Sequence, residues 1–599
     1  MRIPVLIAGL LFFLQLNLPA QERKITILHT NDMHSRLQGF APESAYSPLT
    51  LNNDKTIGGF ARIAAVLKTE RQKPGQATLI IDAGDFLMGT LFHTMEERTG
   101  FQLPLMKEMG YDIVAIGNHE FDFGPQALAR IITKSAAAGK LPVILLGNAI
   151  FSPADDSDNS LEELFRKEII RRTFIKEVGG IRIGFFSLLG KDAVNVAPMA
   201  KPVTFGDQTA FSEKAAKELR SQGCEIVICI SHSGVTPGKN GQWSGEDAEL
   251  AARVKDIDLI ISGHTHTRLD KPVMVNGIPV VQAGEYGEYI GKAVLALSDG
   301  KVKLESYELI PVDDRIMGDR GTDSLIKEQE DKITERILKP NHLDYLEPLL
   351  ESPVSLECNE QGNLDDSNLG PLVADAIHWY LNRNSAAGDD VSMISAGVIR
   401  DKMMPGVQST ADIFRIVPLG FGSDSIPGYP LARTYLTGRE LKNTLEVLLV
   451  AQKSNPDYHC FFSGFRAEYD PGKRLLKKIS KLEIVHPDGK TVNVSFRKKE
   501  KALYSVAANS YMLQFIGVIK KKTHGLINVI PKDINGDKLT DMSKSIVDVD
   551  EKQTGLQEGK EWIALIGYLS RMKDTNNNGI PDLDPGYFKP VRIFSVVKK

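Results

Sequence analysis

The sequence predicts an α/β protein built from two domains. Its 599 residues exceed what one hydrophobic core normally supports. From about Lys24 to Val312, short β-branched apolar runs alternate with stretches of helical character, and several of the runs end in loops rich in Gly, Asp, Asn or His. Near-continuous apolar runs are typical of strands buried on both faces, so this alternation indicates sheets covered by helices.

Seven apolar runs mark the expected strands, at 25–28, 78–81, 112–116, 142–146, 181–186, 225–230 and 258–261. Helices are expected between them, for example over 59–71 and 211–222. The charged stretch 322–338 contains no Gly or Pro, so we expect a solvated helix there that ends at Pro340 and connects the domains. A second domain of mixed α and β follows from about Ser352.

The N-terminus has the composition of an export signal. Arg2 is basic, 5–18 is an apolar run, and Ala20 precedes a polar stretch. This order predicts a secretory signal peptide over 1–20, cleaved after Ala20, and therefore a periplasmic or secreted protein. A membrane anchor is the alternative, but the run is short for a bilayer span, and no later segment is long and apolar enough to form one.

Charge and cysteine content exclude some classes of function. The formal net charge of −4 is small beside 72 basic and 76 acidic side chains, so we do not expect a nucleic-acid partner. Cys224 and Cys229 lie on one expected strand and point to opposite faces, so they cannot bridge each other. Together with Cys358 and Cys460 they are expected to be buried free thiols.

Polar clusters at the ends of expected strands supply the candidate chemistry. Because loops at the carboxyl ends of α/β strands converge, clusters far apart in sequence can surround one point. A single Asp-x-His, Gly-Asp or Ser-His would be uninformative and Gly-Asn-His-Glu at a strand end is more specific, but five clusters in this order are not expected by chance. Their candidate metal ligands are Asp32, His34, Asp85, Asn118, His232, His264 and His266.

These residue types indicate two metal ions. Oxygen and nitrogen ligands without thiolates suit Mn, Fe, Co or Zn and argue against a structural zinc–cysteine site. Seven protein ligands are more than one cation needs, whereas two cations sharing a carboxylate use them all. Such pairs clamp the attacking and leaving oxygens of an in-line displacement, and they lower the pKa of a bound water toward roughly 7.

The five clusters resemble the blocks of the calcineurin-like metallophosphoesterase superfamily: Asp-x-His, Gly-Asp, Gly-Asn-His-Glu/Asp, a single His and Gly-His-x-His. With Phe121-Asp122 after the third block and a second domain behind, the chain resembles the bacterial 5'-nucleotidase/UDP-sugar hydrolase family. The resemblance implies a four-layer sandwich domain at 21–318, a helical linker at 319–350 and a smaller α+β substrate-binding domain at 351–599.

The resemblance also implies roles for the clustered residues. One metal would be held by Asp32, His34 and His266. The other would be held by Asn118, His232 and His264, with Asp85 bridging the two. His119 and Asp122 resemble the family's catalytic dyad, in which a carboxylate orients an imidazole that stabilises or protonates developing charge. A purely structural role for His119 is the alternative.

In this family the second domain binds the nucleotide and rotates to deliver it to the metals. Gly397-Val-Ile-Arg400 resembles the family's Gly-Gly-Ile-Arg loop, so Arg400 is expected to clamp a phosphate or carboxylate. The base-stacking positions depart from the pattern. Leu419 replaces one aromatic ring, Tyr511 keeps the other, and Phe421 is a candidate substitute for the missing ring.

Further departures leave the substrate open. Ser395 stands in place of an Asn, the upstream Arg is missing from 363–366, and 514–518 lacks the expected Gly-Gly-Asp-Gly. We expect hydrolysis of nucleoside 5'-monophosphates or related small phosphate esters. The alternatives are a cyclic-nucleotide phosphodiesterase, a UDP-sugar hydrolase, a phosphatase for a non-nucleotide substrate, and a binding protein that keeps the metals without catalysis.

A second candidate cation site lies near the C-terminus. Asp574, Asn576, Asn578 and Asp582 have the spacing of oxygen ligands in a calcium loop and resemble thrombospondin-type repeats. The loop lacks a glutamate at its twelfth position, where Pro585 stands. A solvated turn rich in Asp and Asn is the alternative.

Overall fold

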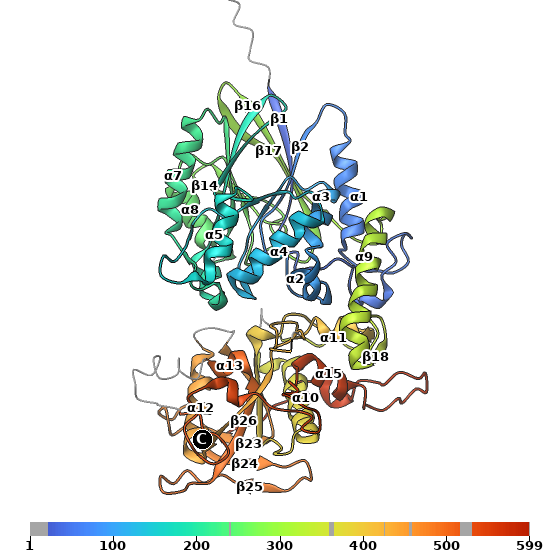
Figure 1. The fold of residues 1–599 in the computed structure, drawn as a ribbon, viewed down its shortest axis with the longest axis vertical. Coiled ribbons are helices and arrows are strands. Elements are labelled where there is room, and N and C mark those ends of the chain that lie inside the picture. The colour runs from blue at the N-terminus through green and yellow to red at the C-terminus, as the bar shows by residue number, and fades with distance from the viewer. Residues whose placement is uncertain are drawn as a thin grey trace, which may run out of the picture.

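The computed structural model describes residues 22–238, 241–358, 364–424, 426–453, 458–514 and 530–597. They form two bodies, which lie one above the other in Figure 1. The predicted signal peptide and the departures at residue 363 and at 515–518 lie outside the described residues. None of the helices in the described part combines the length and the apolar character that a bilayer span needs.

The N-terminal domain contains two stacked sheets. The larger has the order β17-β16-β1-β2-β3-β4-β6. Its strands are β1 (Arg23–Thr30), β2 (Ala77–Asp82), β3 (Ile113–Ala115), β4 (Val143–Leu145), β6 (Ile170–Arg171), β16 (Tyr289–Ser298) and β17 (Lys301–Pro311). The smaller has the order β14-β15-β13-β10-β8-β7. Its strands are β7 (Thr173–Val178), β8 (Ile181–Leu189), β10 (Ile226–His232), β13 (Leu259–Ser262), β14 (Val273–Val275) and β15 (Ile278–Val281). All seven predicted strands are present.

Helices cover both outer faces and make four layers, as predicted (Figure 1). The larger sheet is covered by α1 (Phe60–Arg71), α3 (Gln102–Met109) and α4 (Gly124–Ala138), and α5 (Asn159–Arg166) packs on α4. The smaller is covered by α7 (Gln208–Ser221) and α8 (Glu246–Arg253). Between the sheets lies an apolar core in which Ile27 and Leu79 of one sheet share a cluster with Ile183 and Ile228 of the other.

The connector is α9 (Arg320–Ile333), which continues through 334–341 as irregular helical turns. It begins where the Asp319 carboxylate accepts a hydrogen bond from the Thr322 N–H, at 2.9 Å. The predicted helix is therefore present, but the prediction that it is solvated is only half right. Ile326 and Ile333 are buried, and the helix packs against α1.

The C-terminal domain is built on a sheet of order β21-β26-β19-β22. Its strands are β19 (Val391–Ser395), β21 (Leu431–Thr437), β22 (Cys460–Ser463) and β26 (Leu503–Asn509). One face packs against α10 (Leu369–Asn384) and α15 (Glu561–Leu569), and the other against α12 (Gly438–Ala451). All four cysteines are buried free thiols, as expected.

Smaller elements complete this domain. A second sheet of order β25-β24-β23-β27 contains β23 (Phe465–Tyr469), β24 (Ile479–Val485), β25 (Thr491–Asn493) and β27 (Phe594–Val596). Nearer the first domain, β18 (Pro348–Ser352) pairs with β20 (Gly406–Ser409), which leads into α11 (Thr410–Phe414). The short helix α13 (Ser510–Gln514) follows β26.

Buried ion pairs join the two domains. Arg36 of the first domain lies 3.0 Å from the Asp401 carboxylate of the second. Arg415 of the second domain pairs with Asp401 at 3.0 Å, with Asp412 at 2.9 Å, and with Glu43 of the first domain. Arg36 and Arg415 are only 2% and 3% exposed. Because a buried charge left without its partner is strongly destabilising, parting the domains at this network would be costly.

Candidate metal centre and substrate cavity

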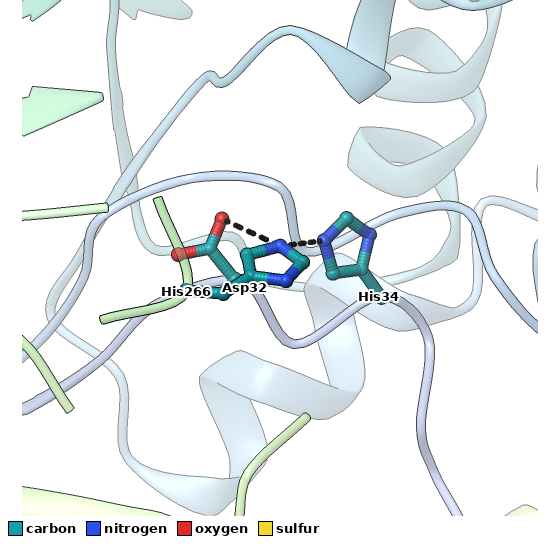
Figure 2. Close-up of side chains that lie close together, drawn as sticks. All are labelled: Asp32, His34 and His266. Carbon is teal, nitrogen blue, oxygen red and sulfur yellow. Dashed lines mark hydrogen bonds and ion pairs between the residues drawn. The ribbon is translucent and has the colours of Figure 1, made fainter. Parts of the chain in front are cut away.

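The first ligand group combines residues that follow β1 and β13. The Nε2 atoms of His34 and His266 lie 3.1 Å apart, and the His266 Nε2 lies 3.6 Å from an oxygen of Asp32 (Figure 2). The other ring nitrogen of His266, Nδ1, donates to Glu285, which leaves its Nε2 with a lone pair. Facing ring nitrogens at this distance are close enough to bind one shared divalent cation.

The second group follows β2, β3, β10 and β13. The His232 Nε2 lies 3.0 Å from an Asp85 oxygen and 3.1 Å from the Asn118 side-chain oxygen, which is also 3.0 Å from the His264 Nδ1. The outer nitrogen of each histidine has its own partner. The His232 Nδ1 donates to the Ala83 carbonyl at 2.9 Å, and the His264 Nε2 lies 3.3 Å from Asp192. These outer contacts turn the lone pairs inward.

Asp85 links the two groups. Three compact sets of candidate ligands occur among the described residues: Asp32, His34 and His266; His34, Asp85 and His119; and Asp85, His232 and His264. Asp85 therefore has ligand atoms within 4.8 Å of His34 on one side and of His232 and His264 on the other. A carboxylate in this position is suited to bridging two cations.

The backbone of the centre is held in an unusual conformation. Five of the seven predicted ligands have left-handed backbones, with φ of 52° at Asp32, 47° at His34, 55° at Asp85, 75° at His264 and 53° at His266. Each such residue costs on the order of 1–3 kcal/mol and persists only where its surroundings impose it. Strain of this kind concentrates at functional sites, so it marks this centre independently of the ligand chemistry.

The electrostatics of the centre call for positive charge. Burial disfavours charged imidazoles, but the Asp85 carboxylate outweighs it and raises the pKa of His232 to about 10. Glu285, again against burial, raises the pKa of His266 to about 9. Without cations, protons would balance these carboxylates, and metal binding would release them. The ligand set contains nitrogen and oxygen but no sulfur, so it fits two cations such as Zn, Mn, Co or Fe.

Three positioning residues were not predicted. The Asn31 side chain donates to Asp32 at 2.6 Å and accepts from the Ala283 N–H at 2.8 Å. The buried Glu120 carboxylate accepts from the N–H groups of Gly117, Asp85 and Leu87 and so ties two ligand loops together. Its place as the fourth residue of the Gly-Asn-His-Glu cluster was a usable signal. No signal in the sequence pointed to Glu285, because it lies nineteen positions after the last ligand.

His119 and Asp122 lie beside the metal centre and face the second domain. The His119 Nδ1 donates to Asp122 at 2.8 Å, and its Nε2 lies 3.3 Å from the Arg400 guanidinium across the domain boundary. The Arg400 carbonyl accepts from the hydroxyl of Tyr286 at 3.0 Å. The predicted dyad and the predicted anion clamp, 281 residues apart in sequence, thus meet at one point.

A cavity of about 1330 Å³ runs from the metal centre into the second domain. Its lining includes Asn118, His119, Arg400, Leu419, Tyr511 and Ser395. Tyr511 stacks on Tyr429, with ring centres 5.1 Å apart and planes 15° from parallel. Nothing in the sequence singled out Tyr429, whose loop contains no recognised motif.

Phe421 lies elsewhere. Its ring packs edge-to-face on Phe123 of the first domain, 5.1 Å between centres, and it is not among the described residues that line the cavity. Tyr429 rather than Phe421 therefore stands beside Tyr511. The substrate-binding role expected for Phe421 stays a prediction without support from its position.

The candidate calcium loop is tightly turned. Asp574 accepts from the N–H groups of Asn578 and Gly579. Glu351, which is distant in sequence, accepts from the side-chain amides of Asn576 and Asn578 at 3.1 and 2.7 Å. A solvated turn and a cation loop both accommodate these contacts.

Comparisons with known proteins agree with this geometry. The family model described as calcineurin-like phosphoesterase matches residues 25–268, and the one described as 5'-nucleotidase, C-terminal domain, matches 351–518. The chain is 25% identical to a trifunctional nucleotide phosphoesterase of Bacillus subtilis (strain 168) over 82% of its own length, but it spans only 32% of that longer protein. It is 24% identical to the 5'-nucleotidase of Bos taurus, over 78% of this chain and 79% of that protein.

A solved structure shares the fold. The 5'-nucleotidase precursor from Thermus thermophilus superposes with a TM-score of 0.67 at 22% identity, covering 96% of this chain and 100% of that one. At this identity the likeness concerns the fold alone.

Proposed function

From the premise that this chain joins a calcineurin-like phosphoesterase domain to a 5'-nucleotidase C-terminal domain, we propose that it is an exported phosphomonoesterase with two metal ions. Its substrates would be nucleoside 5'-monophosphates or related phosphate esters. The observation that carries the proposal is the meeting of Asp85, His119 and Arg400 at one cavity, with contributions from both domains. A bare metal-binding protein would have no use for the oriented dyad.

Different residues of the chain would have different roles in the proposed hydrolysis. Asp32, His34 and His266 would hold one cation, and Asn118, His232 and His264 the other, with Asp85 between them. When bound, the cations would polarise the phosphoryl group and supply the nucleophile. Arg400 would hold the phosphoryl oxygens against the centre by charge-assisted hydrogen bonds. Asp122 keeps the His119 Nε2 directed at the cavity, where it would stabilise or protonate the negative charge that develops on the leaving oxygen.

The first test is hydrolysis of 4-nitrophenyl phosphate by metal-stripped protein after addition of Mn²⁺, Co²⁺ or Zn²⁺. We expect turnover with at least one metal and none in chelator. Absence of turnover with every metal would refute the proposal. Ranking AMP, a 2',3'-cyclic nucleotide, a UDP-sugar and a non-nucleotide phosphate by kcat/KM then identifies the substrate class.

Diesterase activity is the second candidate, because the cavity exceeds the roughly 300–1000 Å³ of ordinary ligand pockets. The extra space would accommodate a second substituent on the phosphate. A cyclic nucleotide or UDP-sugar hydrolysed faster than AMP would favour this alternative.

Two accessory features are also proposed. Export rests on the basic, apolar and small-residue order of 1–20, and cell fractionation with N-terminal sequencing of the mature protein tests it. Calcium binding rests on the oxygen-rich loop at 574–582 and on Glu351, whose carboxylate supplies the acid that the loop lacks. Calcium should raise the Tm of the wild type, and Glu351→Gln should weaken that rise.

A further inference from the structure

We propose that an apolar chamber at the inner end of the substrate cavity receives an apolar part of the substrate's leaving group. This inference rests on the proposed phosphoesterase function and concerns which esters the enzyme prefers. The chamber is part of the same cavity that reaches Asp85 and His119, so one molecule can occupy both ends.

The chamber lies between the C-terminal sheet and α12. Because side chains alternate along a strand, Met393, Leu436 and Val506 of three neighbouring strands share the face turned toward the helix. Val447 and Leu448 of α12 line the opposite side. A layer between a sheet and a helix is normally filled by such side chains, as it is further along α12, where Leu441 and Leu445 are buried. Here most of the side chains are also buried, but the cavity reaches into the layer and they line it.

Two hydroxyl groups mark the chamber as more than a packing gap. Thr434 is fully buried and Thr444 is 6% exposed, and both line the cavity. Among the described residues, neither hydroxyl has a hydrogen-bond partner. A buried hydroxyl without a partner is destabilising, and most are satisfied in folded proteins. An ether, ester or hydroxyl oxygen on an otherwise apolar ligand would satisfy them.

The two ends of the cavity differ in polarity, and this difference indicates which part of the ligand binds at each end. Arg400 and the metal ligands make the outer end suitable for a phosphate. The residues named at the inner end are all uncharged. They are apolar except for the hydroxyl groups of Thr434 and Thr444. A charged or strongly polar leaving group would lose its hydration there without compensation. The ester that fits is therefore one whose alcohol carries an alkyl or aryl extension.

Matched alkyl phosphates test the inference. Ethyl and octyl phosphate have the same chemistry at phosphorus and differ only in apolar length. Each methylene fully buried strengthens binding by about fourfold, so six extra methylenes should raise kcat/KM by on the order of 100-fold even with partial burial. Binding of ethylphosphonate and octylphosphonate to the metal-loaded protein, followed by calorimetry, measures the same preference without turnover.

Filling the chamber should remove the preference. Val447→Trp places a large ring in it, and the octyl-to-ethyl ratio should fall at least about tenfold in both assays. Val450→Trp is the matched control, because Val450 lies on the same helix but is 38% exposed and does not line the cavity. It should leave the ratio unchanged. If Val447→Trp fails to fold, Leu448→Trp at a half-buried position fills the same space.

The outcomes separate this inference from the function on which it rests. The apolar chamber is refuted if octyl and ethyl compounds bind equally, or if Val447→Trp and Leu448→Trp leave the octyl-to-ethyl ratio unchanged. Turnover of 4-nitrophenyl phosphate would still support the phosphoesterase in that case. Absence of all turnover together with selective binding of octylphosphonate would overturn the phosphoesterase and leave the chamber supported as a binding site.

Discussion

The metal centre and the wall of the substrate cavity are held in place by different kinds of contact. In the centre, five ligands have left-handed backbones, and His232, His264 and His266 each have a partner for the outer ring nitrogen. In the second domain, Tyr429 and Tyr511 stack on each other, and Leu419 lines the same cavity. Polar contacts and a strained backbone hold the first region, and packing of side chains forms the second.

The largest expected effect comes from removing the shared ligand. Asp85→Ala should lower kcat by on the order of 10³-fold or more and reduce the metal content below two ions per chain, because both positions lose a ligand. Metal analysis and a steady-state assay measure this. Asp256→Ala, at an exposed position of the same domain, serves as the control. Full activity in Asp85→Ala would show that the two groups do not share this carboxylate.

The dyad should contribute to chemistry without holding metal. His119→Ala should lower kcat by about 10²–10⁴-fold at unchanged metal content, since it removes a proton-transfer group. Asp122→Asn should cost less, about 10–100-fold, because the imidazole remains but its orientation weakens. Equal losses of metal and activity in His119→Ala would instead assign His119 to the metal centre.

Replacing Arg400 tests whether the second domain contributes a phosphate contact beside the metal centre. Arg400→Ala should lower kcat/KM by about 10–100-fold, the range expected for losing charge-assisted hydrogen bonds to a phosphate. The metal content should not change. Arg466→Ala, at an exposed position of the same domain, should have no effect. If Arg400→Ala also has none, the guanidinium does not touch the substrate.

The stacked tyrosines should affect substrate choice alone. Tyr429→Leu should raise KM for AMP by about tenfold, since stacking on a base is worth roughly 1–3 kcal/mol, and should scarcely change hydrolysis of ethyl phosphate. Phe421→Leu should leave both unchanged, because that ring contacts Phe123 instead. An effect of Phe421→Leu on AMP alone would restore the role expected from the sequence.

The smallest effect on activity is expected at His93, which lies between Phe123 and Phe414 of the two domains. Burial lowers its pKa from 6.5 to about 3, and neither ring nitrogen has a partner among the described residues. The unfolded chain therefore takes up a proton below pH 6.5 that the folded chain refuses. Stability should fall as the pH drops from 6.5 toward 3.

His93→Phe should reduce that acid sensitivity and leave kcat at neutral pH unchanged. Thermal unfolding measured between pH 4 and pH 7 provides the test. Burial likewise lowers the pKa of His29 to about 3, so the variant should keep part of the dependence of stability on pH. A pH profile identical to that of the wild type would show that His93 is not a source of it.

The sequence was informative where a residue's role depends on its own strand. Asp32, Asp85 and His232 each follow an apolar run, and parallel pairing brings the ends of such runs together. It was uninformative where the role depends on packing between distant segments. No sequence pattern near Glu285 predicts that it orients His266, and none near Tyr429 predicts that it stacks on Tyr511. Phe421 illustrates the converse, since a suitable residue type pointed to a role that the interdomain contact with Phe123 does not support.

The ion pairs that join the domains have a kinetic consequence. Any motion that parts the domains must separate Arg36 from Asp401 and Arg415 from Glu43, and water must enter a space where all four groups are now buried. Breaking buried pairs is slow to begin and only weakly sensitive to added salt. If the product leaves the cavity only when the domains part, its release rather than bond cleavage would limit turnover.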